Sequence, residues 1–249
     1  LSSYLKEHHD YKYATVVHCD TPSGMLNPVE KICPLLKEYG ILTVVDSVSG
    51  MFGNHMDVDK FQIDLLCGGS QKAVSAPPGL TFVTISDAVK DAMHERKTPI
   101  RSFYASLLAF EGYYEKKWFP YTMPISDIYG LRAAFDNIAS DPELEERALT
   151  EAGLKLHLES GFSDTVTVFD IPAETTCDAI LSRMKKEHNI MLAGSFDDLS
   201  GKVIRIGHMG NNANFEDMTA TMYALSETLT FLGVNLTGNL VGLFLKYYH

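Results

Sequence analysis

The sequence predicts an α/β protein whose larger part is a mainly parallel β-sheet covered by helices. Over the first hundred residues, short apolar strands alternate with amphipathic helices, which is the order of βαβ units. Residues 41–46 are apolar on both faces, as a strand buried between two layers of helices requires. The chain has 249 residues, 45% of them hydrophobic, which is enough to bury such a core.

The first predicted elements are a strand, a turn and a helix. Residues 13–18 are rich in Val and Thr and form a short buried strand, and residues 20–24 form the turn after it. Asn27 then caps a helix that has Pro28 at its first helical position, where the missing proline N–H costs no hydrogen bond. Gly40 ends this helix before the next strand.

The alternation continues along the chain at a similar spacing. The next elements are strands over 63–67 and 80–85 and a helix over 87–97. In a sheet of this kind, ligands collect at the carboxyl ends of the strands. Asp20, Asp46 and the loop 70–72 all follow strand ends, so they are candidates for a single site.

A second, smaller unit is predicted for the C-terminal half, so that a large domain spans residues 1–135 and a connecting helix, a small α+β domain and a tail span residues 136–249. The connecting helix is expected from about 126 to 160, and Asp141-Pro142 allows a break in it. The elements predicted after it are strands over 165–169, 190–192 and 203–206 and helices over 176–187 and 215–232. For residues 233–249, a C-terminal arm and a partner-binding tail both remain open.

The composition excludes several classes of function. The 32 acidic and 21 basic residues give a formal net charge of −11, which disfavours a nucleic-acid-binding surface. No apolar run approaches the roughly 20 residues of a bilayer span, and the first ten residues lack the apolar segment of a signal peptide. The four cysteines show no CxxC pair and no metal-type clustering, which favours buried free thiols in a reducing compartment. We therefore expect a cytoplasmic protein without nucleic-acid or membrane partners.

Lys72 stands in an unusual setting, because it is the one charged residue between Gly68 and Ile85. A lysine among small, weakly polar residues is desolvated, and a desolvated lysine can form a Schiff base with a carbonyl group. A loop lysine between two buried strands is the other interpretation. The stretch by itself favours neither.

Asp46 and Arg205 are charged residues within apolar strands. Asp46 either caps the following turn through Ser47 or pairs with a protonated ring nitrogen of a cofactor, because an unpaired carboxylate there is costly. Arg205 lies within the apolar segment 203–207, which disfavours a plain surface ion pair. His208, which follows closely, is interpreted as a structural residue that holds the turn.

Four motifs share an order and a spacing that resemble one enzyme family. They are Asp46-Ser47-Val48-Ser49-Gly50, Gly69-Ser70-Gln71-Lys72, Ala76-Pro77-Pro78-Gly79 and Arg205-Ile206-Gly207-His208-Met209-Gly210. Together they resemble the class V aminotransferases, and most of all the alanine–glyoxylate, serine–pyruvate and serine–glyoxylate branch. The resemblance runs from about His18 to Leu232 and implies a fold-type I transferase that depends on pyridoxal 5′-phosphate (PLP).

The resemblance also implies a role for each matching residue. Lys72 would form the Schiff base with the cofactor and later move a proton between substrate and cofactor. Asp46 would keep the pyridine nitrogen protonated, so that the ring withdraws electrons, and Val48 would pack against one face of the ring. Thr21 matches a position that bonds the phenolic oxygen or nearby groups, and Gln71 matches one that contacts the phosphate.

Two further matching positions concern the substrate and a second subunit. Arg205 matches the arginine that binds the α-carboxylate of the substrate through two parallel hydrogen bonds. Thr122 matches a residue that reaches the phosphate of the neighbouring subunit's cofactor, which implies a homodimer with shared active sites. Tyr121 or Phe119 would stand where the family often has a tyrosine near the phosphate.

The resemblance implies transamination between a small amino acid of the alanine or serine type and a 2-oxo acid of the glyoxylate or pyruvate type. Family members carry a segment before the position of Leu1, with the phosphate-cradling loop and the aromatic ring that stacks on the cofactor. Neither is found here, so we expect a fragment that lacks its N-terminal part. One alternative is a truncated, non-catalytic member with a binding or regulatory role. Another is a lyase or a desulfurase. A desulfurase needs a mobile reactive cysteine, whereas Cys177 lies at the start of a predicted helix of the small domain.

Overall fold

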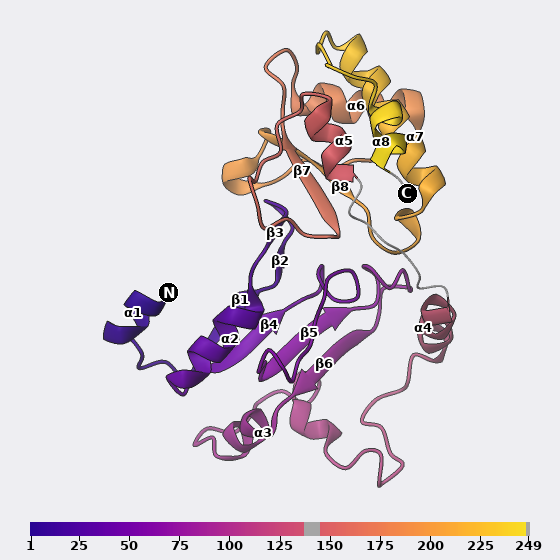
Figure 1. Ribbon diagram of the computed structural model, residues 1–249. Coiled ribbons are helices and arrows are strands. Elements are labelled where there is room, and N and C mark those ends of the chain that lie inside the picture. The colour runs from indigo at the N-terminus through magenta and orange to yellow at the C-terminus, as the bar shows by residue number, and fades with distance from the viewer. Residues whose placement is uncertain (137–144, 248–249) are drawn as a thin grey trace.

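A four-stranded sheet forms the centre of the N-terminal part of the chain (Figure 1). The computed structural model describes residues 1–136 and 145–247. In spatial order, the strands are β1 (Tyr13–Val17), β4 (Leu42–Asp46), β5 (Leu65–Gly69) and β6 (Thr81–Ile85). β1, β4 and β5 are parallel, as predicted, so their carboxyl ends lie at one edge of the sheet.

The last strand runs in the other direction. β6 pairs with β5 in antiparallel register, so the expectation of a continuing βαβ repeat is wrong at this strand. A parallel connection needs a crossover segment, usually a helix, to carry the chain back across the sheet. The link 70–80 contains no helix, and the chain therefore returns directly alongside β5.

Three helices accompany this sheet: α1 (Ser2–Glu7), α2 (Val29–Glu38) and α3 (Asp87–His94). α2 contacts β4 and buries Val29 and Cys33 with Val45 of that strand. Its N-cap is Pro28, one residue later than the predicted cap. Asn27 instead donates from Nδ2 to the carbonyl oxygen of Val17 at 2.8 Å, which ties the helix start to the end of β1.

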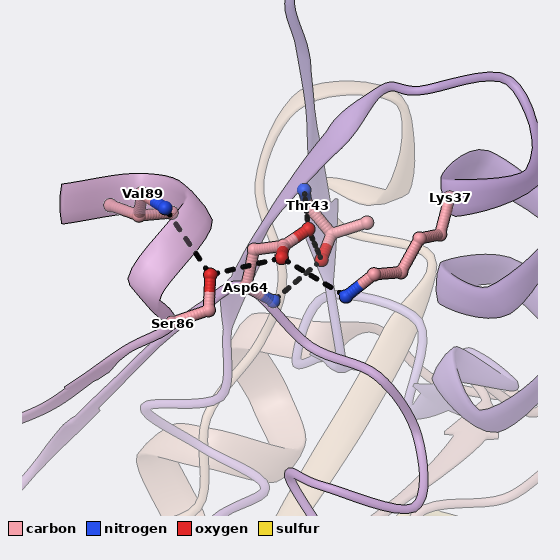
Figure 2. Close-up of polar contacts among 5 residues, drawn as sticks. All are labelled: Lys37, Thr43, Asp64, Ser86 and Val89. Atoms are coloured by element: carbon pink, nitrogen blue, oxygen red, sulfur yellow. Dashed lines mark hydrogen bonds and ion pairs between the residues drawn. The ribbon is translucent and has the colours of Figure 1, made fainter. Parts of the chain in front are cut away.

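A buried carboxylate organises the amino ends of the strands (Figure 2). Asp64, whose side chain is 1% exposed, accepts hydrogen bonds from the Thr43 N–H at 3.0 Å and from the Ser86 hydroxyl at 3.0 Å. Lys37 of α2 approaches the same carboxylate at 3.4 Å. Ser86 also caps α3 by accepting from the N–H of Val89 at 3.3 Å. Asp64 thus joins α2, β4 and α3 at the edge of the sheet opposite the candidate site.

The C-terminal part packs four helices against a two-stranded sheet (Figure 1). Strands β7 (Val166–Asp170) and β8 (Val203–Gly207) are antiparallel, close to the predicted positions. The helices are α5 (Glu145–Glu151), α6 (Cys177–His188), α7 (Phe215–Phe231) and α8 (Leu240–Tyr247). The predicted strand over 190–192 is absent, and Ala193 forms an isolated bridge to Arg205 in its place.

The C-terminal residues are part of this core and form neither a free arm nor an exposed tail. α8 contacts α5 and α7, and Leu240 and Phe244 are 0% and 2% exposed. The apolar pattern of residues 233–249 is therefore explained by packing within the chain, up to residue 247.

The helix predicted over 126–160, with a break allowed at Asp141-Pro142, ends earlier than expected. The described helices in this range are α4 (Ile125–Asp136) and α5 (Glu145–Glu151), and the helical conformation stops before Gly153, whose φ is +88°. The expected break at Asp141-Pro142 lies outside the described residues. No helix within 1–136 and 145–247 is long and apolar enough to cross a lipid bilayer.

A short hairpin links the two parts. It consists of β2 (Cys19–Asp20) and β3 (Met25–Leu26), joined by the predicted turn, and extends from the central sheet toward β7 in Figure 1. Cys19 packs in an apolar cluster with Val166, Val168 and Val203. The hairpin therefore brings residues 20–24 to the strand that carries Arg205.

Candidate active site

The carboxyl edge of the sheet brings together residues that were predicted to share a site. Asp46 is the last residue of β4, and Lys72 follows β5 by three positions. Thr21 lies in the β2–β3 turn. The Lys72 ammonium lies close enough to β2 to act electrostatically on the Cys19 thiol. Lys72 and the hairpin therefore face the same region.

The Asp46 carboxylate is exposed, and one of its oxygens supports the next turn. Its Oδ1 accepts a hydrogen bond from the N–H of Val48 at 3.0 Å, so Asp46 does cap this turn, but through Val48 and not through Ser47 as predicted. Ser47 points elsewhere: its buried hydroxyl meets Nδ1 of His18 at 2.9 Å. Among the described residues, no basic side chain forms an ion pair with Asp46.

The loop that carries Lys72 is held by its neighbours. The Ser70 hydroxyl donates to the carbonyl oxygen of Pro77 at 2.7 Å, and the N–H of Ser75 donates to the carbonyl oxygen of Lys72 at 2.8 Å. Ser75 adopts a left-handed conformation with φ of +57°. Lys72 is half-buried in this loop, whereas Gln71 beside it is exposed.

Arg205 is anchored by two carbonyl oxygens from different parts of the chain. Its Nε donates to Gly194 at 2.6 Å and its Nη1 to Thr21 at 3.3 Å. Burial lowers the pKa of the Arg205 guanidinium, and the nearby Asp20 carboxylate offsets part of that shift. The exposed ring of Phe196 lies 5.8 Å from the guanidinium carbon. The surface-pair alternative is therefore wrong, because the anchors are main-chain oxygens.

A direct bond connects the Lys72 loop to the segment after β8. The N–H of Asn211 donates to the Ser75 hydroxyl at 2.7 Å. Gly210, with φ of +61°, makes this approach possible, since a Cβ there would lie 1.8 Å from the Ser75 oxygen. No role for Gly210 or Ser75 was predicted from the sequence. The glycine in a positive-φ turn was a usable signal, whereas nothing local marks Ser75.

His208 is structural, as predicted. It is buried, its Nε2 meets the Thr167 hydroxyl at 2.8 Å, and burial lowers its pKa to about 4. Val48 is half-buried beside the Asp46 turn. Thr122 is exposed in the segment before α4, and no hydrogen bond within the described residues joins it to Lys72, Asp46 or Arg205. Arg205 is thus bonded to Thr21, Asp46 and Lys72 follow the carboxyl ends of the neighbouring strands β4 and β5, and Thr122 lies in the segment before α4.

Several relatives of this chain are named as aminotransferases. An uncharacterized aminotransferase of Methanocaldococcus jannaschii is 34% identical over 244 residues, which cover 92% of this chain and 63% of the relative. The alanine–glyoxylate aminotransferase of Callithrix jacchus is 32% identical over 235 residues, which cover 86% of this chain and 56% of the relative. The chain thus spans roughly three-fifths of the length of these relatives.

Solved structures agree with the fold. A pyridoxamine–pyruvate aminotransferase from Mesorhizobium loti superposes with a TM-score of 0.90 at 27% identity, covering 99% of this chain and 67% of that one. An alanine–glyoxylate aminotransferase from Nostoc sp. superposes with a TM-score of 0.84 at 30% identity, covering 92% and 64%. The fold is therefore that of the fold-type I PLP-dependent transferases. The sequence profile described as Aminotransferase class-V matches residues 2–224, and the chain belongs to that family.

Proposed function

We propose that this chain is part of a PLP-dependent aminotransferase that moves an amino group between a small amino acid and a 2-oxo acid. The observation that carries the proposal is that Asp46 and Lys72 follow the ends of the neighbouring strands β4 and β5, and that the Lys72 loop is bonded to the segment that follows the strand of Arg205. The alanine–glyoxylate aminotransferases named above support an amino donor of the alanine type and an acceptor of the glyoxylate type, and the pyridoxamine–pyruvate aminotransferase supports pyruvate as acceptor. A donor of the serine type rests on the sequence resemblance alone. Retention of the three charged residues favours catalysis over a non-catalytic role.

The chemistry of the donor set fits the cofactor of this family. PLP, when bound, withdraws electrons from the substrate carbon that carries the amino group. Asp46 has a carboxylate oxygen available for a ring N–H, and Lys72 is half-buried without an ion pair among the described residues. Lys72 would hold the cofactor at its carbonyl group, and as a free amine it would accept the proton that leaves the substrate Cα. Arg205 orients the substrate through its α-carboxylate.

The remaining predicted residues complete the proposed cofactor site. Val48 packs on the cofactor ring, Thr21 bonds its phenolic oxygen or neighbouring groups, and Gln71 contacts its phosphate. We propose that Thr122 serves the site of a second subunit in a homodimer. The exposed aromatic residues around this segment support an interface, since Tyr104 and Tyr129 are 78% and 73% exposed.

We also propose a division into a large domain, residues 1–135, and a small domain, residues 136–249. The largest apolar cluster is drawn wholly from residues beyond 145, while two other clusters lie wholly before residue 83. The four free cysteines support a reducing location, the cytoplasm. Cys177 is buried in the small-domain cluster, which disfavours its use as the reactive thiol of a desulfurase.

The test uses the full-length protein incubated with excess PLP. The parent is expected to show the absorption band of a PLP Schiff base, and borohydride reduction followed by peptide mass spectrometry should place the label on Lys72. Lys72→Ala should abolish both signals. Lys31→Ala, on the exposed face of α2, is the matched control and should keep them. Absence of the band in the parent protein would refute the proposal.

The dimer is tested by mixing two full-length variants, Lys72→Ala and Thr122→Val. In a hybrid dimer, the subunit that keeps Lys72 receives an intact Thr122 from its neighbour if Thr122 acts across the interface. One site per hybrid should then regain the parental affinity for PLP. A hybrid whose affinity stays at that of the Thr122→Val homodimer would place Thr122 outside the neighbour's site.

A further inference from the structure

Thr165 is completely buried where the two parts of the chain meet. It directly precedes β7, beside the end of β8. Its hydroxyl donates to the carbonyl oxygen of Ser49 at 2.8 Å, and its own carbonyl oxygen accepts from the N–H of His208 at 3.1 Å. Thr165 therefore holds a loop of the N-terminal part with its side chain and a strand end of the C-terminal part with its main chain.

Each of these two partners lies beside a proposed site residue. Ser49 follows Val48 directly and Asp46 by three positions. His208 follows Arg205 by three positions, at the end of β8. Thr165 therefore connects the end of β8, the strand of Arg205, to the loop after Asp46. The connection consists of one residue and two hydrogen bonds.

The Thr165 hydroxyl has a defined direction, because each hydroxyl or thiol carries one proton. Since Thr165 gives its proton to Ser49, the Ser163 hydroxyl, 2.8 Å away, must donate to Thr165. Ser163 in turn accepts from the Cys19 thiol at 3.1 Å. Burial raises the pKa of that thiol, so it stays a donor. Each group in this chain of hydrogen bonds donates to the next one, from Cys19 through Ser163 and Thr165 to Ser49. The Thr165 hydroxyl therefore has one orientation.

The surroundings leave little room for another arrangement. A Cβ on Gly53 would lie 2.2 Å from Cγ2 of Thr165, so the methyl group already fills the space beside the loop. Asn54 adds a second clamp: its Oδ1 accepts from the N–H of Asp164 at 2.8 Å, and its Nδ2 donates to the carbonyl oxygen of Gly50 at 3.2 Å. A shift of the segment before β7 must consequently be passed to residues 49–54.

We propose that Thr165 is a positioning residue. It couples the binding of a carboxylate at Arg205 to the affinity of the loop after Asp46 for the cofactor. The inference rests on the proposed function, because it assigns both ligands to this chain. When β8 moves toward a bound carboxylate, the hydrogen bond from the Thr165 hydroxyl to Ser49 moves the loop after Asp46 with it. By thermodynamic reciprocity, PLP then tightens the binding of the carboxylate by the same factor.

The experiment measures that factor in the full-length protein. The dissociation constant of PLP is determined with and without saturating propionate, a carboxylate that carries neither an amino nor a keto group. The parent should bind PLP at least about fivefold more tightly with propionate, the lower end of usual couplings. Thr165→Val, which keeps the shape and removes the hydroxyl, should bring the ratio close to one. Thr165→Ser, which keeps the hydroxyl, should stay within about twofold of the parent.

The outcomes separate a coupling role from a structural one. Equal weakening of PLP binding in Thr165→Val with and without propionate leaves the ratio at the parental value and overturns the inference. A parent that binds PLP but shows no coupling also overturns it, while the proposed function stands. A parent that binds no PLP refutes both. If Thr165→Val fails to fold, Thr165→Ala replaces it, and Arg205→Lys is the second variant that should remove the coupling.

Discussion

Arg205 of β8 donates a hydrogen bond to the carbonyl oxygen of Thr21, 184 residues earlier in the chain, at 3.3 Å. A second donor of the same guanidinium reaches Gly194 at 2.6 Å. The planar fork of arginine can satisfy both oxygens and still present an edge to a ligand, which the single ammonium of lysine cannot.

Arg205→Lys is therefore expected to raise the KM for the amino acid substrate by about 10- to 100-fold, the range for losing a hydrogen bond to a charged group. Steady-state kinetics of the full-length enzyme provide the measurement. Arg183→Lys is the matched control, because Arg183 lies on α6, away from the site. Its guanidinium carbon stands 3.5 Å from the centre of the Phe231 ring. An unchanged KM in Arg205→Lys would remove Arg205 from the proposed carboxylate site.

Gly210→Ala should damage the link between the Lys72 loop and the segment after β8. Gly210 and Gly201 both have positive φ, +61° and +72°, but only the Cβ at 210 would meet another atom, the Ser75 oxygen, at 1.8 Å. Gly201→Ala should cost about 1 kcal/mol from backbone strain. Gly210→Ala should cost clearly more and weaken PLP binding. Urea unfolding and PLP titration of the two variants test this, and equal losses would contradict it.

The stability of the protein should depend on His208 at mildly acidic pH. Its pKa in the folded chain, about 4, lies below the ordinary value of 6.5, so between these values the unfolded chain binds the proton more strongly. The contribution is fully present above pH 6.5 and is lost as the pH falls toward 4, with a slope of up to ~1.4 kcal/mol per pH unit.

His208→Gln is expected to flatten this dependence, since glutamine does not titrate. Reversible urea unfolding at pH 7 and at pH 5 gives the free energy of unfolding of both proteins. The difference between the two pH values should be smaller in the variant. Equal differences would show that His208 is not the group responsible.

Asp64→Asn should destabilise the fold without touching the candidate site. The carboxylate accepts from Thr43 and Ser86 and pairs with Lys37. In the asparagine variant, the NH₂ group would face one of these hydrogen-bond donors, so that bond would be lost. A loss of about 2–4 kcal/mol is expected for a buried, charged hydrogen-bond acceptor. Asp59→Asn, at an exposed position of the loop before β5, is the control. Unfolding midpoints in urea that match between the two variants would contradict this assignment.

The sequence alone predicted most of the secondary structure, the strand-end positions of Asp46 and Lys72, and the place of Arg205 within a strand. These follow from local signals, namely apolar periodicity, caps and glycine turns, which a chain segment carries within itself. Local signals do not predict a feature that depends on a contact with a distant part of the chain. The antiparallel direction of β6 depends on the short link before it, and the packing of Phe244 in the core depends on α5 and α7.

Membership of the class V aminotransferases, and with it the expected lysine, aspartate and arginine, was determined by the sequence itself, because reactive groups are recognised by residue type and spacing. Only the tertiary structure decided how these residues are held. Ser75 meets Asn211 and Thr165 meets Ser49, pairs separated by 136 and 116 residues. Such bonds form when two folded parts pack together, so no periodicity within either segment announces them. The loop of Lys72 is therefore held by the segment after β8, and the loop after Asp46 by the residue before β7.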